Sequence, residues 1–326
     1  MSAVDGESTN PPIPWYKLPW IKRLVHLAVL GITVVLVGQH VIQAANELRH
    51  QEFRINVGWV ALASLGYLVG FAIQGIPWFL VNRDWDLPVP FLRSERAYLV
   101  SHVGKYVPGK MMVIVIRYGL VSSLGIGFGT VFMTTLFETF ITMASGSSAA
   151  IVCLLALPTP EGFAGAFSSH PWLILGIMGM CAGFLGVITP WGYQFFSKIV
   201  TAPFKDARVL ADRRIRVATV LGAFAVGLVA WSVMGLSYLA TLNAVLPEPL
   251  GLEAWPMTIT CVALSIVVGF LSMIPGQAGV RELILIEALK PVVGNLGAVA
   301  ASLLFRVLTL FVEAGLAAVL YLGGRR

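Results

Sequence analysis

The stretch WPMTITCVALSIVVGFLSMIPGQAGVRELILIEALK, residues 255–290, contains two apolar segments separated by Pro275, Gly276 and Gly279. Proline removes a backbone donor and glycine commonly ends helices, so this stretch predicts two helices that meet at a break. Within a lipid bilayer, a break is tolerated only where protein or a water-filled cavity covers it. We therefore interpret residues 255–290 as a re-entrant hairpin, which enters the membrane and returns to the same side.

A second stretch has the same character. Residues 97–124, AYLVSHVGKYVPGKMMVIVIRYGLVSSL, are apolar on both sides of Pro108 and Gly109. The same argument predicts a second re-entrant hairpin here.

Six further apolar runs exceed the ~17 residues that a helix needs to cross the hydrocarbon core. They cover residues 24–42, 57–81, 128–157, 172–190, 217–246 and 298–322. The first run is interpreted as an uncleaved anchor rather than a cleaved signal peptide, because it reaches full span length. The predicted fold class is an all-α polytopic membrane protein with about six full spans and two Pro-Gly hairpins.

The composition excludes several classes of protein. Of the 326 residues, 57% are hydrophobic and 12% are charged, against roughly 25% charged in a soluble domain. A soluble enzyme, a disordered chain and a nucleic-acid-binding module are excluded. The three cysteines lie in apolar runs and the five histidines are scattered, so we expect no disulfide framework, no metal site and no cofactor.

The distribution of Lys and Arg predicts the orientation. With the N-terminus inside, sixteen of these residues fall in the predicted cytoplasmic segments and four in the outside connections, with Arg117 and Arg306 left within the membrane. Positive residues collect on the cytoplasmic side of membrane proteins. We expect a multi-pass protein of the cell membrane with both termini in the cytoplasm.

The order of spans and hairpins predicts two repeats of inverted topology. The predicted units are a tail (1–23), repeat A with the first hairpin (24–157), repeat B with the second (158–322) and a short end (323–326). Pro108 precedes Glu138 by 30 residues, and Pro275 precedes Arg306 by 31. Many transporters have this architecture, although two Pro-Gly breaks can also arise by chance in a glycine-rich chain.

Charges inside the predicted membrane region are candidates for function, because burying them is costly. They are Arg117, Glu138, Arg281, Glu282, Glu287, Arg306 and Glu313. Glu138 and Arg306 either line a polar cavity between the repeats or form a structural salt bridge. Arg117, Arg281 and Lys290 could instead extend to an interface.

The hairpin tips suit a phosphate. Lys105 and Lys110 flank the first break, and a glycine-rich turn precedes the helix that begins near Arg281. Free N–H groups at a helix N-terminus attract anions. The alternative is a turn that only permits tight packing. The predicted substrate-binding residues are Lys105, Pro108, Gly109, Lys110, Arg117, Glu138, Pro275, Gly276, Gly279, Arg281, Glu282 and Arg306.

KYVPGK at 105–110, PGQAGVRE at 275–282, Glu138 and Arg306 resemble the lysylphosphatidylglycerol synthase/flippase transmembrane family over about residues 20–322. The resemblance implies movement of an aminoacylated phospholipid or a polyprenyl-linked glycolipid between leaflets. The chain departs from the family pattern at Thr139, where Arg is common, and at Gln277, where a small residue is common. No soluble aminoacyl-transfer domain follows Arg326, so we expect no lipid-aminoacylating activity.

The sequence therefore predicts a protein that flips an anionic, aminoacylated or polyprenyl-linked sugar lipid. Its expected partner is a membrane lipid and not a nucleic acid, and a homo-oligomer is compatible with the sequence. One alternative is a membrane enzyme acting on a lipid-linked sugar, with Asp84 and Asp86 holding a divalent metal. Against it, no catalytic constellation is evident, so we expect no enzyme. A small-solute transporter is the other alternative.

Overall fold

The computed structural model describes residues 55–107, 111–156, 158, 162–168, 171–211, 213 and 215–323, and every regular element in these ranges is helical. The α-helices are α2 (Val57–Ile73), α3 (Ile76–Asp84), α4 (Phe91–Ser101), α5 (Met111–Val121), α6 (Phe128–Ala156), α7 (Phe163–Ser168), α8 (Pro171–Ile188), α9 (Pro190–Thr201), α10 (Arg208–Ala211), α11 (Val217–Val245), α12 (Trp255–Leu271) and α13 (Val280–Gly323). Short 3-10 helices are η2 (His102–Tyr106), η3 (Ser122–Leu124), η4 (Lys205–Ala207), η5 (Leu252–Ala254) and η6 (Pro275–Gln277). The predicted all-α fold is confirmed.

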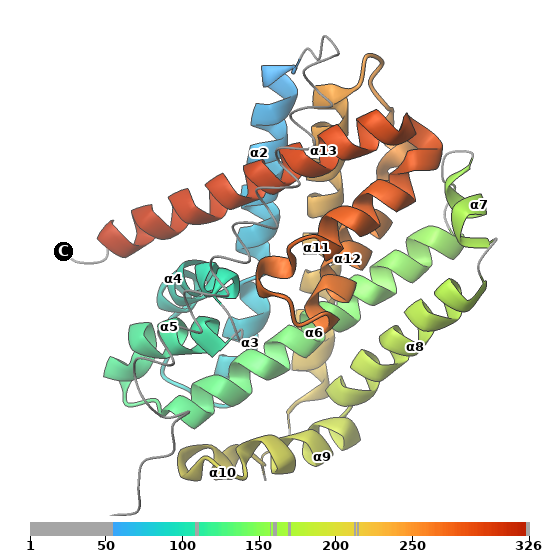
Figure 1. The fold of residues 1–326 in the computed structure, drawn as a ribbon. Coiled ribbons are helices and arrows are strands. Elements are labelled where there is room, and N and C mark those ends of the chain that lie inside the picture. Colours follow the sequence, from blue (N-terminus) through green and yellow to red (C-terminus); the bar gives the residue numbers. More distant parts are fainter. Residues whose placement is uncertain are drawn as a thin grey trace, which may run out of the picture.

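Helix α11 lies at the centre of the bundle. It packs along α2 and also contacts α6, α12 and α13. Helix α6 packs against α8 and α12, and Figure 1 shows α8 running beside it. The buried side chains between these helices are mainly apolar, and the charged residues described below are inserted among them.

Five described helices are long and apolar enough to cross a membrane, and six if α8 and α9 count as one bent span. The predicted spans 128–157 and 217–246 correspond to α6 and α11. The predicted span 298–322 corresponds to the part of α13 that follows Gly294, a single residue whose backbone is not helical. The predicted first span, 24–42, and the tail 1–23 lie outside the described residues.

The predicted span 57–81 lies within one candidate membrane span, Val57–Asp84, which consists of α2 and α3 with a short interruption at Gln74 and Gly75. Pro77 follows within the first turn of α3, where its missing N–H removes no helical bond. At the other end, the side chain of Asn56 accepts hydrogen bonds from Gly58 N and Trp59 N and caps α2.

The predicted span 172–190 ends at Ile188, where α8 is followed by α9 at an angle of 78°. The hydroxyl of Thr189 accepts a hydrogen bond from Gly192 N, which fixes the start of α9. Helix α9 buries Tyr193 and leaves Trp191 86% exposed. An exposed apolar face on a helix that turns away from a span is typical of a position along the membrane surface.

The second predicted helix break is present, and the described helices on either side of the first are separate elements. Helix α4 and η2 lead into the first break, and α5 follows it, while Pro108, Gly109 and Lys110 themselves lie outside the described residues. In the second, η6 separates α12 from α13, and Gly276 and Gly279 have φ of 57° and 81°. Together with η5, α12 is long enough to cross the membrane completely rather than to enter and return. The re-entrant hairpin at 255–290 and the inverted repeat therefore stay predictions.

Candidate functional site

The segments beside the two predicted breaks meet, because η2 contacts η6. The ring of Tyr106 lies on Gly276, where an added Cβ would come within 2.7 Å of Tyr106 Cδ1. Gly276 also needs its positive φ. Glycine is therefore required here both by backbone conformation and by the approach of the opposite tip.

Glu313 on α13 joins the two tips to α2. Its carboxylate accepts hydrogen bonds from Lys105 Nζ at 2.6 Å, from Tyr106 Oη at 3.0 Å and from Tyr67 Oη. The side chain of Glu313 is fully buried, while that of Lys105 is 24% exposed. We call Tyr67, Lys105, Tyr106 and Glu313 the Glu313 cluster. Sequence reasoning found Lys105 and Glu313, quoted Tyr106 only as part of KYVPGK, and missed Tyr67, because a tyrosine in an apolar run carries no distinct signal.

Two arginines lie beside this cluster, and both are deeply buried. Arg306 donates from Nη1 to the carbonyl of Gly276 at 2.8 Å, and the same nitrogen is 3.4 Å from Oε1 of Glu282. Arg281 stacks over the ring of Phe305, with 4.8 Å between Cζ and the ring centroid. Arg281 and Arg306 are only 4% and 5% exposed. We call these two residues the arginine pair.

The arginine pair is incompletely satisfied. Nη2 of Arg281 and Nε of Arg306 are buried without a hydrogen-bond partner among the described residues, and Arg281 forms no ion pair with any described carboxylate. Glu282 uses only Oε2 to cap the start of α13, where it accepts from Gly279 N at 2.8 Å, while its Oε1 faces Arg306 at 3.4 Å without a hydrogen bond in the described part of the chain. Free guanidinium N–H groups in a buried site favour an anion with several acceptor oxygens.

The charge balance supports this conclusion. The Glu313 cluster and the arginine pair, with Glu282, contain three cationic side chains and two carboxylates. The buried region therefore carries one excess positive charge when all five groups are ionised. An isolated buried charge is strongly unfavourable, and an anionic ligand would neutralise it.

Glu138 pairs with Arg117 and not with Arg306, so of the two alternatives the salt bridge between Glu138 and Arg306 is not formed. Nη1 of Arg117 lies 3.2 Å from Oε2 of Glu138, and the two side chains are 1% and 4% exposed. Arg117 Cζ lies over the rings of Trp78 and Tyr98, at 4.6 and 4.9 Å from their centroids. Its Nε donates to the hydroxyl of Ser101.

The environment of Arg117 also corrects the expectation that it extends to an interface. Arg117 and Arg281 are both buried, whereas Lys290 and Glu287 are exposed. The hairpin formed by α4 and α5 returns Arg117 to α6, so its partner comes from the same half of the chain.

Asp84 and Asp86 of the Asp-x-Asp sequence are already engaged with the chain itself. Asp84 accepts hydrogen bonds from the guanidinium of Arg216 and the hydroxyl of Thr219, and Asp86 is 3.4 Å from Arg213. Within the described ranges, no cluster of His, Cys, Asp and Glu could hold a metal ion.

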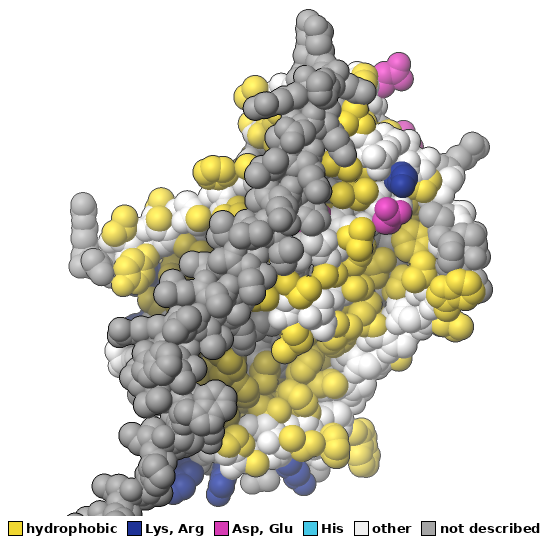
Figure 2. Space-filling view, in the orientation of Figure 1, with side chains coloured by type: hydrophobic (Ala, Val, Ile, Leu, Met, Phe, Trp, Pro, Cys, Tyr) yellow, Lys and Arg dark blue, Asp and Glu magenta, His cyan; other side chains and the backbone are white. Residues whose placement is uncertain are grey.

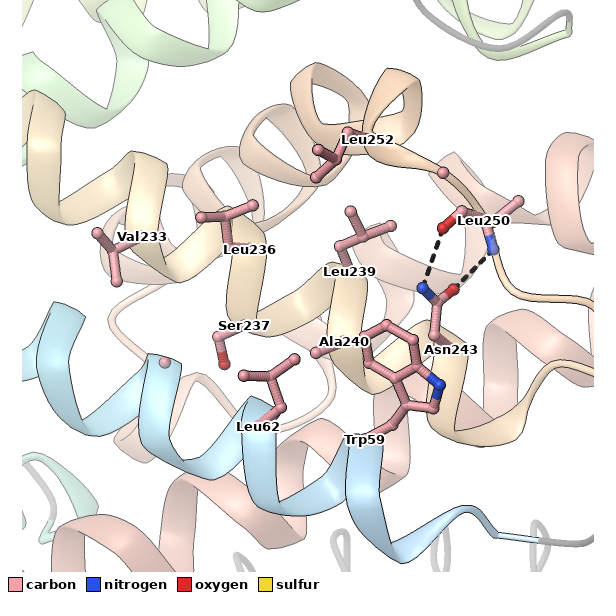
Figure 3. A pocket seen from close by; sticks show the side chains of 12 residues that line it. Trp59, Leu62, Val233, Leu236, Ser237, Leu239, Ala240, Asn243, Leu250 and Leu252 are labelled. Carbon is pink, nitrogen blue, oxygen red and sulfur yellow. Dashed lines mark hydrogen bonds between the residues drawn. The ribbon is translucent and has the colours of Figure 1, made fainter.

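An apolar pocket of about 450 Å³ lies between α2 and α11 and is shown in Figure 3. Trp59 and Leu62 of α2 and Leu236 of α11 point into it. At one end, the amide of Asn243 bonds both the N–H and the carbonyl of Leu250. None of the charged residues above lines this pocket, so its chemistry suits a hydrocarbon chain and not a headgroup.

Replacing Glu313 with glutamine is expected to destabilise the protein by about 2 kcal/mol, because Lys105 loses its carboxylate partner. The partial exposure of Lys105 keeps the cost below that of a fully buried pair. Reversible unfolding in mixed detergent micelles would measure the loss. The exposed Glu287→Gln on the same helix is the control, and equal stability of the two variants would contradict the assignment.

A family model described as the lysylphosphatidylglycerol synthase TM region matches residues 24–316. This range includes both helix breaks, the Glu313 cluster and the arginine pair. No curated protein matches the chain.

Proposed function

The chain belongs to the lysylphosphatidylglycerol synthase transmembrane-region family, and from this premise we propose that it moves an anionic lipid between the leaflets of a membrane. Membership indicates a function related to membrane lipids. The step to transport rests on the arginine pair, whose N–H groups without a partner among the described residues are the single observation that carries the proposal. In this proposal the protein makes and breaks no covalent bond.

The charged headgroup is the part of the lipid that opposes its movement across the membrane. An ionised phosphate that crosses ~30 Å of hydrocarbon without partners faces a very large desolvation barrier. Arg281 and Arg306 offer fixed donors to replace water, while the acyl chains remain in an apolar environment such as the pocket beside Trp59. An aminoacylated phospholipid and a polyprenyl-phosphate-linked sugar both present this phosphate chemistry.

The Glu313 cluster would hold the two hairpin tips together when no headgroup is bound. Its carboxylate holds Lys105 and Tyr106 of one hairpin against Gly276 of the other. A phosphate that approaches the arginine pair competes with Glu313 for Lys105, so binding would loosen the contact between the tips. Alternate opening of these tips would expose the headgroup to one leaflet and then to the other.

We place the protein in the cell membrane with both termini in the cytoplasm. The charge bias of the sequence supports this orientation. Figure 2 shows Lys and Arg side chains gathered along the edge where Figure 1 places α9 and α10, segments predicted to face the cytoplasm.

Mass spectrometry of lipids that remain bound to the purified protein would test the proposal. We expect anionic phospholipids or phosphate-linked glycolipids to be enriched relative to the surrounding membrane. Arg281→Gln should reduce this enrichment, while Lys290→Gln, on the exposed part of the same helix, should preserve it. A bound-lipid profile identical to that of the bulk membrane would count against an anion-selective site.

A further inference from the structure

Glu95 is a second acidic residue near the buried pair of Arg117 and Glu138, and sequence reasoning did not single it out. It lies on α4, which precedes the first helix break and is not among the helices long enough to cross a membrane. An added Cβ at Gly75 would collide with Oε2 of Glu95. The carboxyl group of Glu95 is therefore inserted at the turn between α2 and α3.

The other carboxyl oxygen of Glu95 is unsatisfied. Oε1 is buried and has no hydrogen-bond partner among the described residues. The guanidinium of Arg117, the nearby cation, is already bonded to Glu138, Ser101 and Thr135. Two carboxylates thus share one cation, and the group carries one excess negative charge whenever Glu95 is ionised.

The groups that act on Glu95 come from several elements. Arg117 on α5 and Glu138 on α6 influence its charge, and Tyr98 lies on its own helix. The turn between α2 and α3 contributes Gly75 and no titratable side chain. On η2 and α13, Lys105 and Glu313 pair with each other.

Burial raises the pKa of Glu95 to about 7, with Arg117 lowering the pKa and Glu138 raising it. A carboxyl group in this range gains and loses a proton near neutral pH. Chains of acidic and histidine side chains commonly serve as proton sites in membrane transporters.

We propose that Glu95 is a proton-binding site linked to the binding and passage of the anionic headgroup. The proposal rests on the proposed function, because it concerns the same lipid. Glu95 and Glu313 both act electrostatically on Tyr98, so the charge of Glu95 reaches the region of the Glu313 cluster, and an ionised Glu95 would repel an approaching phosphate. A proton taken from water onto the carboxylate oxygen removes that charge, so the proton and the anion favour each other's binding.

The linkage has a defined direction with pH. If the protonated form is the competent one, the competent fraction falls about tenfold between pH 6 and pH 8 for a group of this pKa. Exchange of fluorescent phosphatidylglycerol in proteoliposomes at equal pH on both sides should slow by the same factor. Exchange by Glu95→Gln should no longer depend on pH, because glutamine stays neutral. Exchange by Glu95→Asp should still depend on pH, because aspartate also titrates. The exposed Glu287→Gln should behave like wild type.

A second readout does not depend on transport. Because the neutral form of Glu95 is favoured in the folded state, wild type should lose thermal stability as pH rises from the ordinary pKa of 4.5 to about 7. Glu95→Gln should lose less over the same window. Equal pH dependence of stability in the two proteins would overturn the assignment of Glu95.

The outcomes separate the two proposals. Wild type that moves lipid equally fast from pH 6 to pH 8, or a Glu95→Gln variant that slows in parallel with it, would overturn the proton link and leave lipid transport standing. Wild type that moves no lipid at any pH would overturn both proposals.

Discussion

Glu138→Gln is expected to lower the free energy of unfolding by about 3 kcal/mol, because it leaves the guanidinium of Arg117 buried without its bonded carboxylate. The value lies at the low end of the usual range of about 3–5 kcal/mol for a broken buried pair. Glu95 is close enough to influence Arg117 and should offset part of the loss. Reversible unfolding in mixed detergent micelles would measure it.

A double-mutant cycle identifies the partner of Glu138. Combining Glu138→Gln with Arg117→Gln should recover part of the stability, with a coupling energy of about 0.5–3 kcal/mol. Combining Glu138→Gln with Arg306→Gln should give additive losses, because the bonded partners of Arg306 are Gly276 and Glu282. Coupling to Arg306 and none to Arg117 would show that the pairing described here is incorrect.

Arg281→Gln is expected to slow the exchange of an anionic lipid at least tenfold while leaving the folded yield intact. A hydrogen bond to a charged group contributes about 1.5–3 kcal/mol, and 1.4 kcal/mol corresponds to a factor of ten. Folding should survive because Arg281 forms no ion pair with a described carboxylate, so its removal leaves none of them unpaired. The measurement is exchange of labelled phosphatidylglycerol in proteoliposomes.

The control for this variant is Lys290→Gln, which removes one positive charge from an exposed position of the same helix. It should exchange lipid at the wild-type rate. If Arg281→Gln also exchanged lipid at that rate, Arg281 would be a packing residue on Phe305 and not a phosphate ligand.

The arrangement of helices was largely predictable, because apolar length and helix breakers act locally. The run at 217–246 becomes α11, and the interruption at Pro275 and Gly276 separates α12 from α13. The apolar run at 57–81 lies within the candidate span Val57–Asp84, and only the short interruption at Gln74 and Gly75 was not evident from the pattern.

The ion pairs were not predictable, because a partner depends on how helices return in space. The similar spacing of Glu138 and Arg306 from their helix breaks suggested that these two residues pair. In the structure, the return of α5 against α6 places Arg117 beside Glu138 instead. Glu95 was missed for a related reason. It lies in the charged segment RSER at 93–96, which suggests a hydrated surface, and only the packing of α4 against the turn at Gly75 buries one of its oxygens.

The most direct test of the account compares the wild-type protein with protein-free vesicles. Labelled phosphatidylglycerol and a labelled diacylglycerol, which has no phosphate, would be placed in one leaflet and their appearance in the other followed. The account predicts that the protein accelerates phosphatidylglycerol at least tenfold and leaves the diacylglycerol rate unchanged. Phosphatidylglycerol exchange no faster than in protein-free vesicles would contradict the claim that the buried arginines carry an anionic headgroup across the membrane.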